Sequence, residues 1–418
     1  MQLRMVSALG LVILIALAWA LSEKRSRIGW RLVVMGLALQ FAIGIVLLIV
    51  PVIRDTVFAG MGGVVNLLTD STRAGAKVIF GQLADSVEIP TGGGPGSEGG
   101  VFTLAAPFAF TVLPVIIFVS ALAAILHHLH VIQFFVGATS WLMRRSLRTS
   151  GAETLGAALL IFLGIEAVSA IRGYLARMTR SELCTIMTTF MATIAGSVMI
   201  IYATFGAEPG HLLIASLMSA PAAILFAKML VPETEQPETS GDQRVHVQID
   251  SFNVIDAAAQ GTATGLNMAL SVGAMVIVFV ALIHMLNLFL SWGIGVTFTD
   301  LMAYAFYPFA LVMGVPKADA WTVAQLLGTK SVINEFVAYL DLQAAIQAGA
   351  LSPRSITIAT YALCGFANPG SIGIAIAGLD ALIPERRREV TGLAWKSFVG
   401  GTLACFATAC VAGILVDA

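Results

Sequence analysis

Long apolar stretches recur along the whole chain, and they constrain its fold more than any other feature of the sequence. Several exceed the roughly 17–25 residues that an α-helix needs to cross a bilayer. Of the 418 residues, 58% are hydrophobic and 11% are charged, whereas soluble domains carry roughly 25% charged residues. The sequence therefore predicts an all-α polytopic membrane protein.

The charge and the side-chain chemistry argue against several other classes of function. The formal net charge is −1 at pH 7, which disfavours a nucleic-acid partner because such partners need a basic surface. An intramembrane hydrolase would need a nucleophile with a base or an HExxH-type metal motif, and neither is recognisable in the sequence. We therefore expect a protein that is not an enzyme. The four cysteines lie in apolar segments without metal-ligand spacing, so we expect core residues at positions 184, 364, 405 and 410.

Four clusters of basic residues predict the orientation of the apolar segments. Because basic loops stay in the cytoplasm, the first segment, residues 5–21, should run from the outside to the inside. Arg4 alone precedes this segment, so we interpret it as a retained helix rather than a signal peptide. The resulting topology places both termini on the outer face. The clusters lie at residues 24–31, 144–148, 172–180 and 386–388.

A glutamate, Glu166, lies inside a 17-residue apolar run, residues 155–171, with arginines on both sides. The flanking charges place both ends of this run in the cytoplasm, so the sequence predicts a re-entrant hairpin at about 150–174. Irregular backbone survives at membrane depth only where protein or a water-filled cavity surrounds it. A central charge costs about 2.5–3.5 kcal/mol, which favours a functional role for the carboxylate. An ordinary span with misleading flanking charges is the alternative.

The same order of segments occurs a second time. A second hairpin, predicted at about 318–346, carries Lys330, Asn334 and Glu335. Each hairpin is followed by a Ser or Thr helix start and by an interrupted helix, with "TIAGS" at 193–197 and "CGFANPGS" at 364–371. The topology enters the two units from opposite sides, which predicts the inverted repeat of many secondary transporters.

The segment "FANPGSIG" is the strongest signal for a binding site. Pro369 lacks an amide hydrogen and Gly370 tolerates unusual dihedral angles, so the helix should break and expose the polar side chains of Asn368 and Ser371. Such transporters bind substrate at discontinuous helices near the membrane midplane. A proline kink in a packed helix is the alternative.

Several motifs resemble the concentrative nucleoside transporter family along nearly the whole chain. They are "NVIDAAAQGTATGLNMALSVGAMVI" (253–277), "VINEFVAY" (332–339), "ALCGFANPGSIGI" (362–374) and "PERRR" (384–388). The resemblance implies a homotrimer in the bacterial inner membrane that imports nucleosides with Na⁺ or H⁺. It also implies about eight transmembrane helices and two re-entrant hairpins, divided between scaffold and elevator-type transport domains.

This resemblance divides the chain into five parts. They are N-terminal scaffold helices with a Gly-rich outer loop at 91–100 (1–131), a first repeat (132–231), a cytoplasmic linker (232–252), a scaffold helix (253–300) and a second repeat (301–418). Lipid and a nucleoside are the expected partners, with no organic cofactor and no metal beyond a possible Na⁺.

By resemblance, four intact positions bind the nucleoside, and chemistry agrees because carboxylate, amide and hydroxyl groups suit ribose hydroxyls. Glu335, Asn368 and Ser371 match the ribose ligands, and Phe366 matches the aromatic residue against the nucleoside; Val198 keeps a position that lines the base pocket. The first hairpin departs from the family pattern Gly-Gln-Thr-Glu. Its four positions are occupied here by Leu163, Gly164, Ile165 and Glu166.

Two hypotheses follow from these departures. Loss of the polar Gln and Thr should alter base selectivity, because an apolar site discriminates weakly. The second concerns the ion: by the resemblance, Leu159 stands where sodium-coupled members have an Asn that helps hold Na⁺, and Thr193 keeps the hydroxyl of the partner Ser. Backbone carbonyls with Thr193 would still suit Na⁺, and proton coupling through Glu166 carries at least equal weight.

Three further points stay open in the sequence. Lys330 is a possible charge partner of Glu335 or Glu166, with Asn334 beside it. An ion channel is disfavoured because it would more naturally repeat a polar filter in each subunit. An ion-coupled carrier for a different polar solute on the same fold is the main alternative to a nucleoside transporter.

Overall fold

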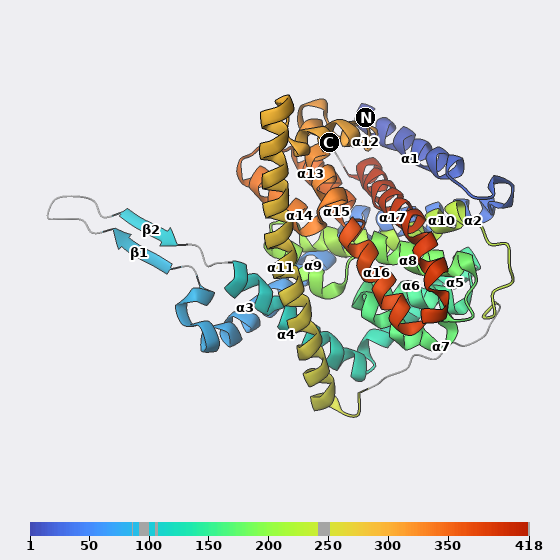
Figure 1. Cartoon of the computed structure of the whole chain (residues 1–418), viewed down its shortest axis with the longest axis horizontal. Coiled ribbons are helices and arrows are strands. Elements are labelled where there is room, and N and C mark those ends of the chain that lie inside the picture. The colour runs from blue at the N-terminus through green and yellow to red at the C-terminus, as the bar shows by residue number, and fades with distance from the viewer. Residues whose placement is uncertain (86, 92–99, 105–107, 241–250, 417–418) are drawn as a thin grey trace.

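The computed structural model describes residues 1–85, 87–91, 100–104, 108–240 and 251–416, with the backbone alone at 87–91, 100–104, 166–167 and 294. Helices dominate these residues, as predicted (Figure 1). The exception is an antiparallel pair of strands, β1 (Val87–Thr91) and β2 (Gly100–Leu104), which projects from one side of the molecule. The predicted Gly-rich loop at 91–100 joins these strands, and its centre lies outside the described residues.

The N-terminal part contains one helix that the sequence did not predict. Its helices are α1 (Gln2–Ala20), α2 (Trp30–Gly44), α3 (Pro51–Phe80) and α4 (Phe108–His128). We expected the chain to pass from the second segment straight into the outer loop, but the 30-residue α3 intervenes. Its sequence mixes apolar residues with Asp70, Arg73 and Lys77, so it lacks the continuous apolar run by which the other helices were recognised.

The two repeats have the same order of elements. The first contains α5 (Val131–Leu147), α6 (Gly151–Leu163), a 3₁₀ segment (Ile165–Ile171), α7 (Arg172–Leu175), α8 (Arg180–Ala192), α9 (Gly196–Thr204) and α10 (Pro209–Leu230). After α11 (Val254–Ile294), the second contains α12 (Phe298–Val312), α13 (Lys317–Val332), α14 (Glu335–Gln347), α15 (Pro353–Leu363), α16 (Pro369–Leu382) and α17 (Arg387–Leu415). Short 3₁₀ or π-helical turns cover Arg25–Arg27, Ile45–Ile49, Gly81–Ala84 and Pro384–Arg386.

Local sequence sets the boundaries of the interrupted helices. Thr179 caps α8 in a reciprocal capping box with Glu182, and Ser352 caps α15 ahead of Pro353. Both helices then stop where expected, at 193–195 between α8 and α9 and at 364–368 between α15 and α16. Because these stops follow from nearby residues, the sequence alone was sufficient to predict them.

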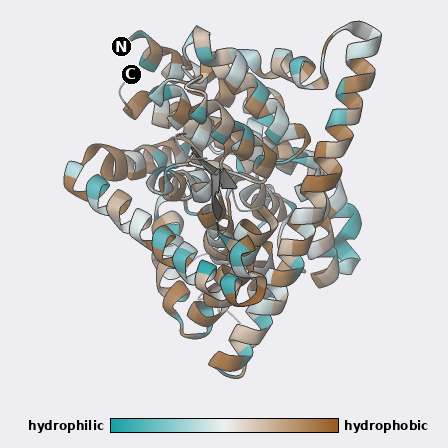
Figure 2. Ribbon diagram, turned by 90° about the vertical axis from the view of Figure 1, so that its left-hand side faces the viewer, coloured by the Kyte–Doolittle hydropathy of each residue, from teal (hydrophilic) through white to brown (hydrophobic). Residues whose placement is uncertain are grey.

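Seven helical stretches of the described residues are long and apolar enough to cross a membrane, when α8 and α9 are counted together as residues 180–204. The eighth span of the prediction corresponds to α15 and α16, which the break divides into helices of 11 and 14 residues. Apolar residues also dominate the outer helices (Figure 2). On α11, for example, Ile277 is 71% and Trp292 is 90% exposed, which suits an apolar surrounding. The chain is therefore an integral membrane protein.

Three helices, α8, α10 and α17, pack against one another in the centre of the molecule, while α4 and α11 lie side by side at one edge (Figure 1). The two termini lie together, and Arg4 Nε donates a hydrogen bond to the Val416 carbonyl oxygen at 3.4 Å. That the termini lie on the outer face of the membrane stays a prediction.

Glu23, in the connection between α1 and α2, ties this connection to two other helices. Its Oε1 accepts from Arg180 Nη2 at 3.0 Å and from Lys396 Nζ at 3.1 Å. Partial burial alone would raise the pKa of Glu23, but the hydrogen bonds from Arg180 and Lys396 outweigh burial and hold this pKa below its ordinary value. A carboxyl with a lowered folded-state pKa stabilises the protein above its unfolded-state pKa and loses this contribution as the pH falls through the folded-state value.

Replacing Glu23 by Gln is therefore expected to lower the free energy of unfolding at neutral pH by about 0.2–1 kcal/mol, the usual range for such pairs. The difference from the wild type should shrink as the pH falls below about 4.3, the ordinary Glu value. Thermal unfolding of both proteins in detergent across this pH range measures it. A difference that stays constant down to about pH 3 would contradict the ion-pair explanation.

Candidate functional site

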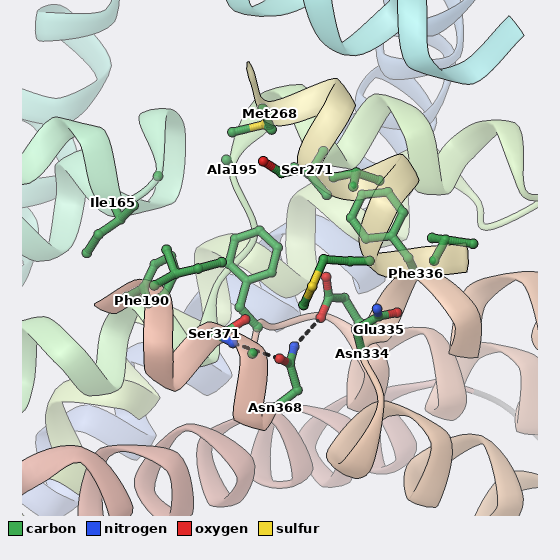
Figure 3. Close-up of a pocket in the computed structure, with 18 of the residues that line it drawn as sticks. Ile165, Phe190, Ala195, Met268, Ser271, Asn334, Glu335, Phe336, Asn368 and Ser371 are labelled. Carbon is green, nitrogen blue, oxygen red and sulfur yellow. Dashed lines mark hydrogen bonds between the residues drawn. The ribbon is translucent and has the colours of Figure 1, made fainter. Parts of the chain in front are cut away.

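The two helix breaks and the second hairpin converge on a cavity of about 420 Å³ (Figure 3). This volume lies within the roughly 300–1,000 Å³ of small-molecule sites. One wall comes from the hairpins and broken helices, and the other comes from α11. The lining residues are Gly164, Ile165, Phe190, Ala195, Val198, Thr264, Asn267, Met268, Ser271, Val272, Met275, Val276, Asn334, Glu335, Phe336, Phe366, Asn368, Gly370, Ser371 and Ile374.

Glu335 is the charged centre of this cavity. The chain breaks between α13 and α14, so that Glu335 occupies the first turn of α14, and Asn334 caps this helix by accepting from the Val337 amide at 2.9 Å. The Glu335 side chain is 3% exposed. Its Oε2 accepts from Asn368 Nδ2 at 2.7 Å, and its Oε1 accepts from the Tyr202 hydroxyl at 2.8 Å. Both oxygens are thereby oriented, and each retains acceptor capacity.

Asn368 and Ser371 face Glu335 from the start of α16. Asn368 caps this helix, and its Oδ1 accepts from the Ser371 amide at 2.8 Å. The first turns of α14 and α16 therefore meet at the carboxylate, as Figure 3 shows. Helix N-termini carry partial positive charge, so this geometry stabilises an anion at Glu335. The cavity thus presents a carboxylate, an amide and a hydroxyl side by side.

Lys330 lies near this site but has another hydrogen-bond partner. Its ammonium group is buried and donates to the Ala362 carbonyl oxygen at 2.7 Å, close to the C-terminus of α15. A cation is favourable at that helix end, and its charge also acts electrostatically on the Glu335 carboxylate. Lys330 therefore joins α13 to α15 behind the cavity, and pairing with Glu166 stays a prediction.

The first hairpin supplies an apolar wall. Gly164 and Ile165 line the cavity (Figure 3). Gly164 ends α6 with φ 81° and ψ −164°, a conformation that residues with a Cβ rarely adopt. A glutamine at this position would strain the turn. Glu166 follows in the 3₁₀ segment, and its side chain is outside the described set.

The remaining predicted residues lie around the same region. Val198 and Phe366 line the cavity, and the Phe366 ring lies 5.5 Å from that of Phe190. Leu159 is fully buried in apolar surroundings. Thr193 is also buried, and its hydroxyl donates to the Thr189 carbonyl oxygen at 2.8 Å, which leaves its lone pairs available.

Sequence reasoning missed two groups of residues at this site. The first is aromatic and lies behind the cavity lining: the Tyr202 hydroxyl donates to Glu335, and its ring stacks on Tyr339 with ring centroids 4.3 Å apart. The second is a polar face of α11, formed by Thr264, Asn267 and Ser271. Polar residues at spacings of three and four along an otherwise apolar helix were the available signal for the second group.

We expect Tyr202→Phe to reduce the affinity for a polyhydroxylated ligand about three- to tenfold. Glu335 loses the hydroxyl that orients its carboxylate, and hydrogen bonds to a charged group are stronger than neutral ones. Removal of only the hydroxyl preserves the stacking on Tyr339. Ligand affinity and thermal unfolding of the purified variant measure the two effects separately. Tyr304→Phe is a matched control, since Tyr304 is exposed on α12. An unchanged affinity would show that the hydrogen bond is purely structural.

Three family descriptions match the chain. "Na+ dependent nucleoside transporter N-terminus" matches residues 9–83, "Nucleoside recognition" matches 109–231, and "Na+ dependent nucleoside transporter C-terminus" matches 211–413. The matches follow one another along the chain and together include the two repeats and the N-terminal helices.

Individual relatives agree with these matches. The chain is 40% identical to the uncharacterized transporter YutK of Bacillus subtilis, with 98% of each chain covered. It is 38% identical to mouse solute carrier family 28 member 3, with 100% of this chain and 59% of the relative covered. Mouse sodium/nucleoside cotransporter 1 is 35% identical, with 99% and 64% covered. The chain thus spans less than two thirds of the length of these mammalian relatives.

Solved structures extend the similarity to the whole fold. CNTnw in an inward-facing substrate-bound state superposes with a TM-score of 0.89 at 38% identity, with 98% of each chain covered. A CNTnw variant in an outward-facing state gives a TM-score of 0.89 at 36% identity, with 99% of each chain covered. With the family descriptions, the relatives and the fold in agreement, this chain belongs to the concentrative nucleoside transporter family.

Proposed function

We propose that this protein imports nucleosides by symport with a cation. The observation that carries the proposal is the arrangement of Glu335, Asn368 and Ser371 around one cavity. A buried, pre-oriented carboxylate accepts hydrogen bonds from the neighbouring hydroxyls of a ribose, and the amide and hydroxyl groups beside it both donate and accept. The apolar wall of Ile165, Val198 and Phe366 suits the faces of a base.

The proposed transport cycle is alternating access by an elevator-type movement. The hairpins and broken helices would move together with the bound nucleoside, while the paired helices α4 and α11 would belong to the stationary scaffold. The meeting of these two sets of elements at one cavity supports this division. By the resemblance, the scaffold would assemble a homotrimer in the bacterial inner membrane, with both termini outside and both hairpins re-entrant.

We propose Na⁺ as the coupling ion, bound where α6 ends against the break between α8 and α9. A Cβ on Gly196 would lie 3.2 Å from the Phe162 carbonyl oxygen, so this oxygen in the last turn of α6 faces the break. Together with the Thr193 hydroxyl it offers the oxygen ligands that a hard cation needs, although Leu159 offers none. A proton carried by Glu166 is the competing possibility.

Uptake of labelled nucleosides into proteoliposomes under imposed gradients tests the proposal. We expect an inward Na⁺ gradient to drive accumulation of at least one nucleoside, with competition by other ribonucleosides but not by free ribose. Uptake that persists without Na⁺ and collapses with a protonophore would overturn the assignment of the ion. Competition by solutes without a base would favour a carrier for a different polar solute.

The altered first hairpin gives a second test, which concerns base selectivity. We propose that Ile165 relaxes discrimination at the base, because an apolar wall cannot hydrogen-bond to it. Ile165→Thr restores a hydroxyl without disturbing the conformation of Gly164. We expect the variant to change the ratio of uridine to adenosine uptake severalfold, and identical ratios would contradict the proposal.

A further inference from the structure

The helix α11 presents a striped face to the cavity. Thr264, Asn267 and Ser271 lie three and four residues apart and therefore share one side of the helix. All three line the cavity, and the stripe continues with Val272, Met275 and Val276. The stripe is therefore polar toward its N-terminal end and apolar toward its C-terminal end. In Figure 3, Met268 and Ser271 lie across the cavity from Asn368.

Close packing against α4 fixes the rotation of this stripe. Small residues recur every fourth position on another face of α11, at Gly261, Gly265, Ala269 and Gly273. A Cβ on Gly261 would lie 2.7 Å from the Ser120 carbonyl oxygen, and one on Gly265 would lie 2.8 Å from Ile117 Cα. Small residues that recur in this way let helix backbones approach closely in membranes. The polar stripe is consequently held toward the cavity.

The cavity needs polar groups at the end away from Glu335. Glu335, Asn368 and Ser371 serve the ribose under the proposed function, and Asn334 Oδ1 already accepts from the Val337 amide at the start of α14. On the opposite side, the described side chains of the first hairpin and of its neighbours in the cavity are apolar. They are Ile165, Phe190, Val198 and Phe366. A base in contact with this wall alone would leave its hydrogen-bonding edge unpaired, which is costly in a site that excludes water.

We propose that Thr264, Asn267 and Ser271 of α11 form a subsite that hydrogen-bonds the edge of the nucleobase. An Asn side chain carries both an acceptor and two donors, and each hydroxyl can donate or accept, so the stripe can complement purine or pyrimidine edges. This inference rests on the proposed nucleoside transport. In this proposal α11 recognises the base in place of the first hairpin, because Gly164 and Ile165 provide no polar side chain.

Binding of adenosine, inosine, uridine, cytidine and 2′-deoxyadenosine to the purified full-length protein tests the subsite. The variant Asn267→Leu/Ser271→Ala removes the polar groups while keeping similar side-chain volumes. We expect the ratios of affinity among the four ribonucleosides to change about tenfold, as the loss of one or two neutral hydrogen bonds allows. The ratio of adenosine to 2′-deoxyadenosine should stay constant, because the ribose ligands are intact.

Thr264→Val and Thr262→Val form a matched pair on the same helix. Thr262 donates to the Ala258 carbonyl oxygen and is not among the residues that line the cavity, so its replacement should leave every ratio unchanged. The subsite would be wrong if the double variant kept the wild-type affinity ratios among the four ribonucleosides. It would also be wrong if Thr262→Val changed these ratios as much as Thr264→Val does. The proposed nucleoside transport would stand in both cases. Absence of nucleoside binding to the wild type would instead overturn the proposed function.

Discussion

Glu335→Gln is expected to lower nucleoside affinity about a hundredfold. The substitution removes the charge and one acceptor, so that the amide nitrogen of Gln would face either the Tyr202 hydroxyl or the Asn368 amide, both of which donate to the carboxylate in the wild type. Hydrogen bonds to charged groups contribute about 1.5–3 kcal/mol each, and each 1.4 kcal/mol corresponds to tenfold in affinity. Loss of one or two ribose contacts then accounts for the expected effect.

Equilibrium binding of labelled uridine or adenosine to the purified variant is the appropriate measurement, with initial uptake rates in proteoliposomes beside it. Glu385→Gln serves as the control, because Glu385 lies in the exposed turn after α16. If Glu335→Gln bound nucleosides as tightly as the wild type did, the carboxylate would not be a ribose ligand, and the assignment of the cavity would have to be revised.

Lys228→Met is expected to lower the free energy of unfolding by about 3–5 kcal/mol, the cost of leaving a buried charge without its partner. Lys228 Nζ lies 2.9 Å from Glu153 Oε1 and 3.0 Å from Glu233 Oε2. The Glu153 and Lys228 side chains are 1% and 9% exposed. This triad joins the start of α6 to the end of α10, and therefore holds the first hairpin against the centre of the molecule.

The double variant Glu153→Leu/Lys228→Met separates the charge from the packing. Replacing both members of a buried pair by apolar residues is often neutral or stabilising, so most of the loss should be recovered. Thermal unfolding of the three proteins in detergent, followed by tryptophan fluorescence, gives the comparison. A double variant as unstable as Lys228→Met would show that the lysine acts through its packing and that the ion pair contributes little.

Local sequence signals predicted the positions where helices start and stop. Asn368, Pro369 and the glycines around them predicted the break in the second repeat, and Thr179 predicted the start of α8. These predictions were confirmed because a helix terminus depends on caps and dihedral preferences of the nearest residues. The same reasoning did not detect α3, since an amphipathic helix lacks a continuous apolar run.

The composition of the cavity was predicted only in part. The positions Glu335, Phe366, Asn368 and Ser371 were grouped through resemblance to a family, and the structure places them around one cavity. Tyr202 was missed because nothing in its own segment indicates a partner 133 residues away. The direction in which a side chain points depends on the rotation of its helix, which the packing of neighbouring helices sets.

The sequence by itself determined that this chain is a helical membrane protein with two similar units and with interrupted helices in each, because hydropathy, charge distribution and caps act over short distances. The tertiary structure alone decided which polar groups meet. It placed Lys330 against Ala362, joined Lys228 to Glu153, and turned the polar stripe of α11 toward the cavity. The physical reason is that a buried polar group without a hydrogen-bond partner costs free energy. Only the packing of distant helices determines which partner lies within hydrogen-bonding distance.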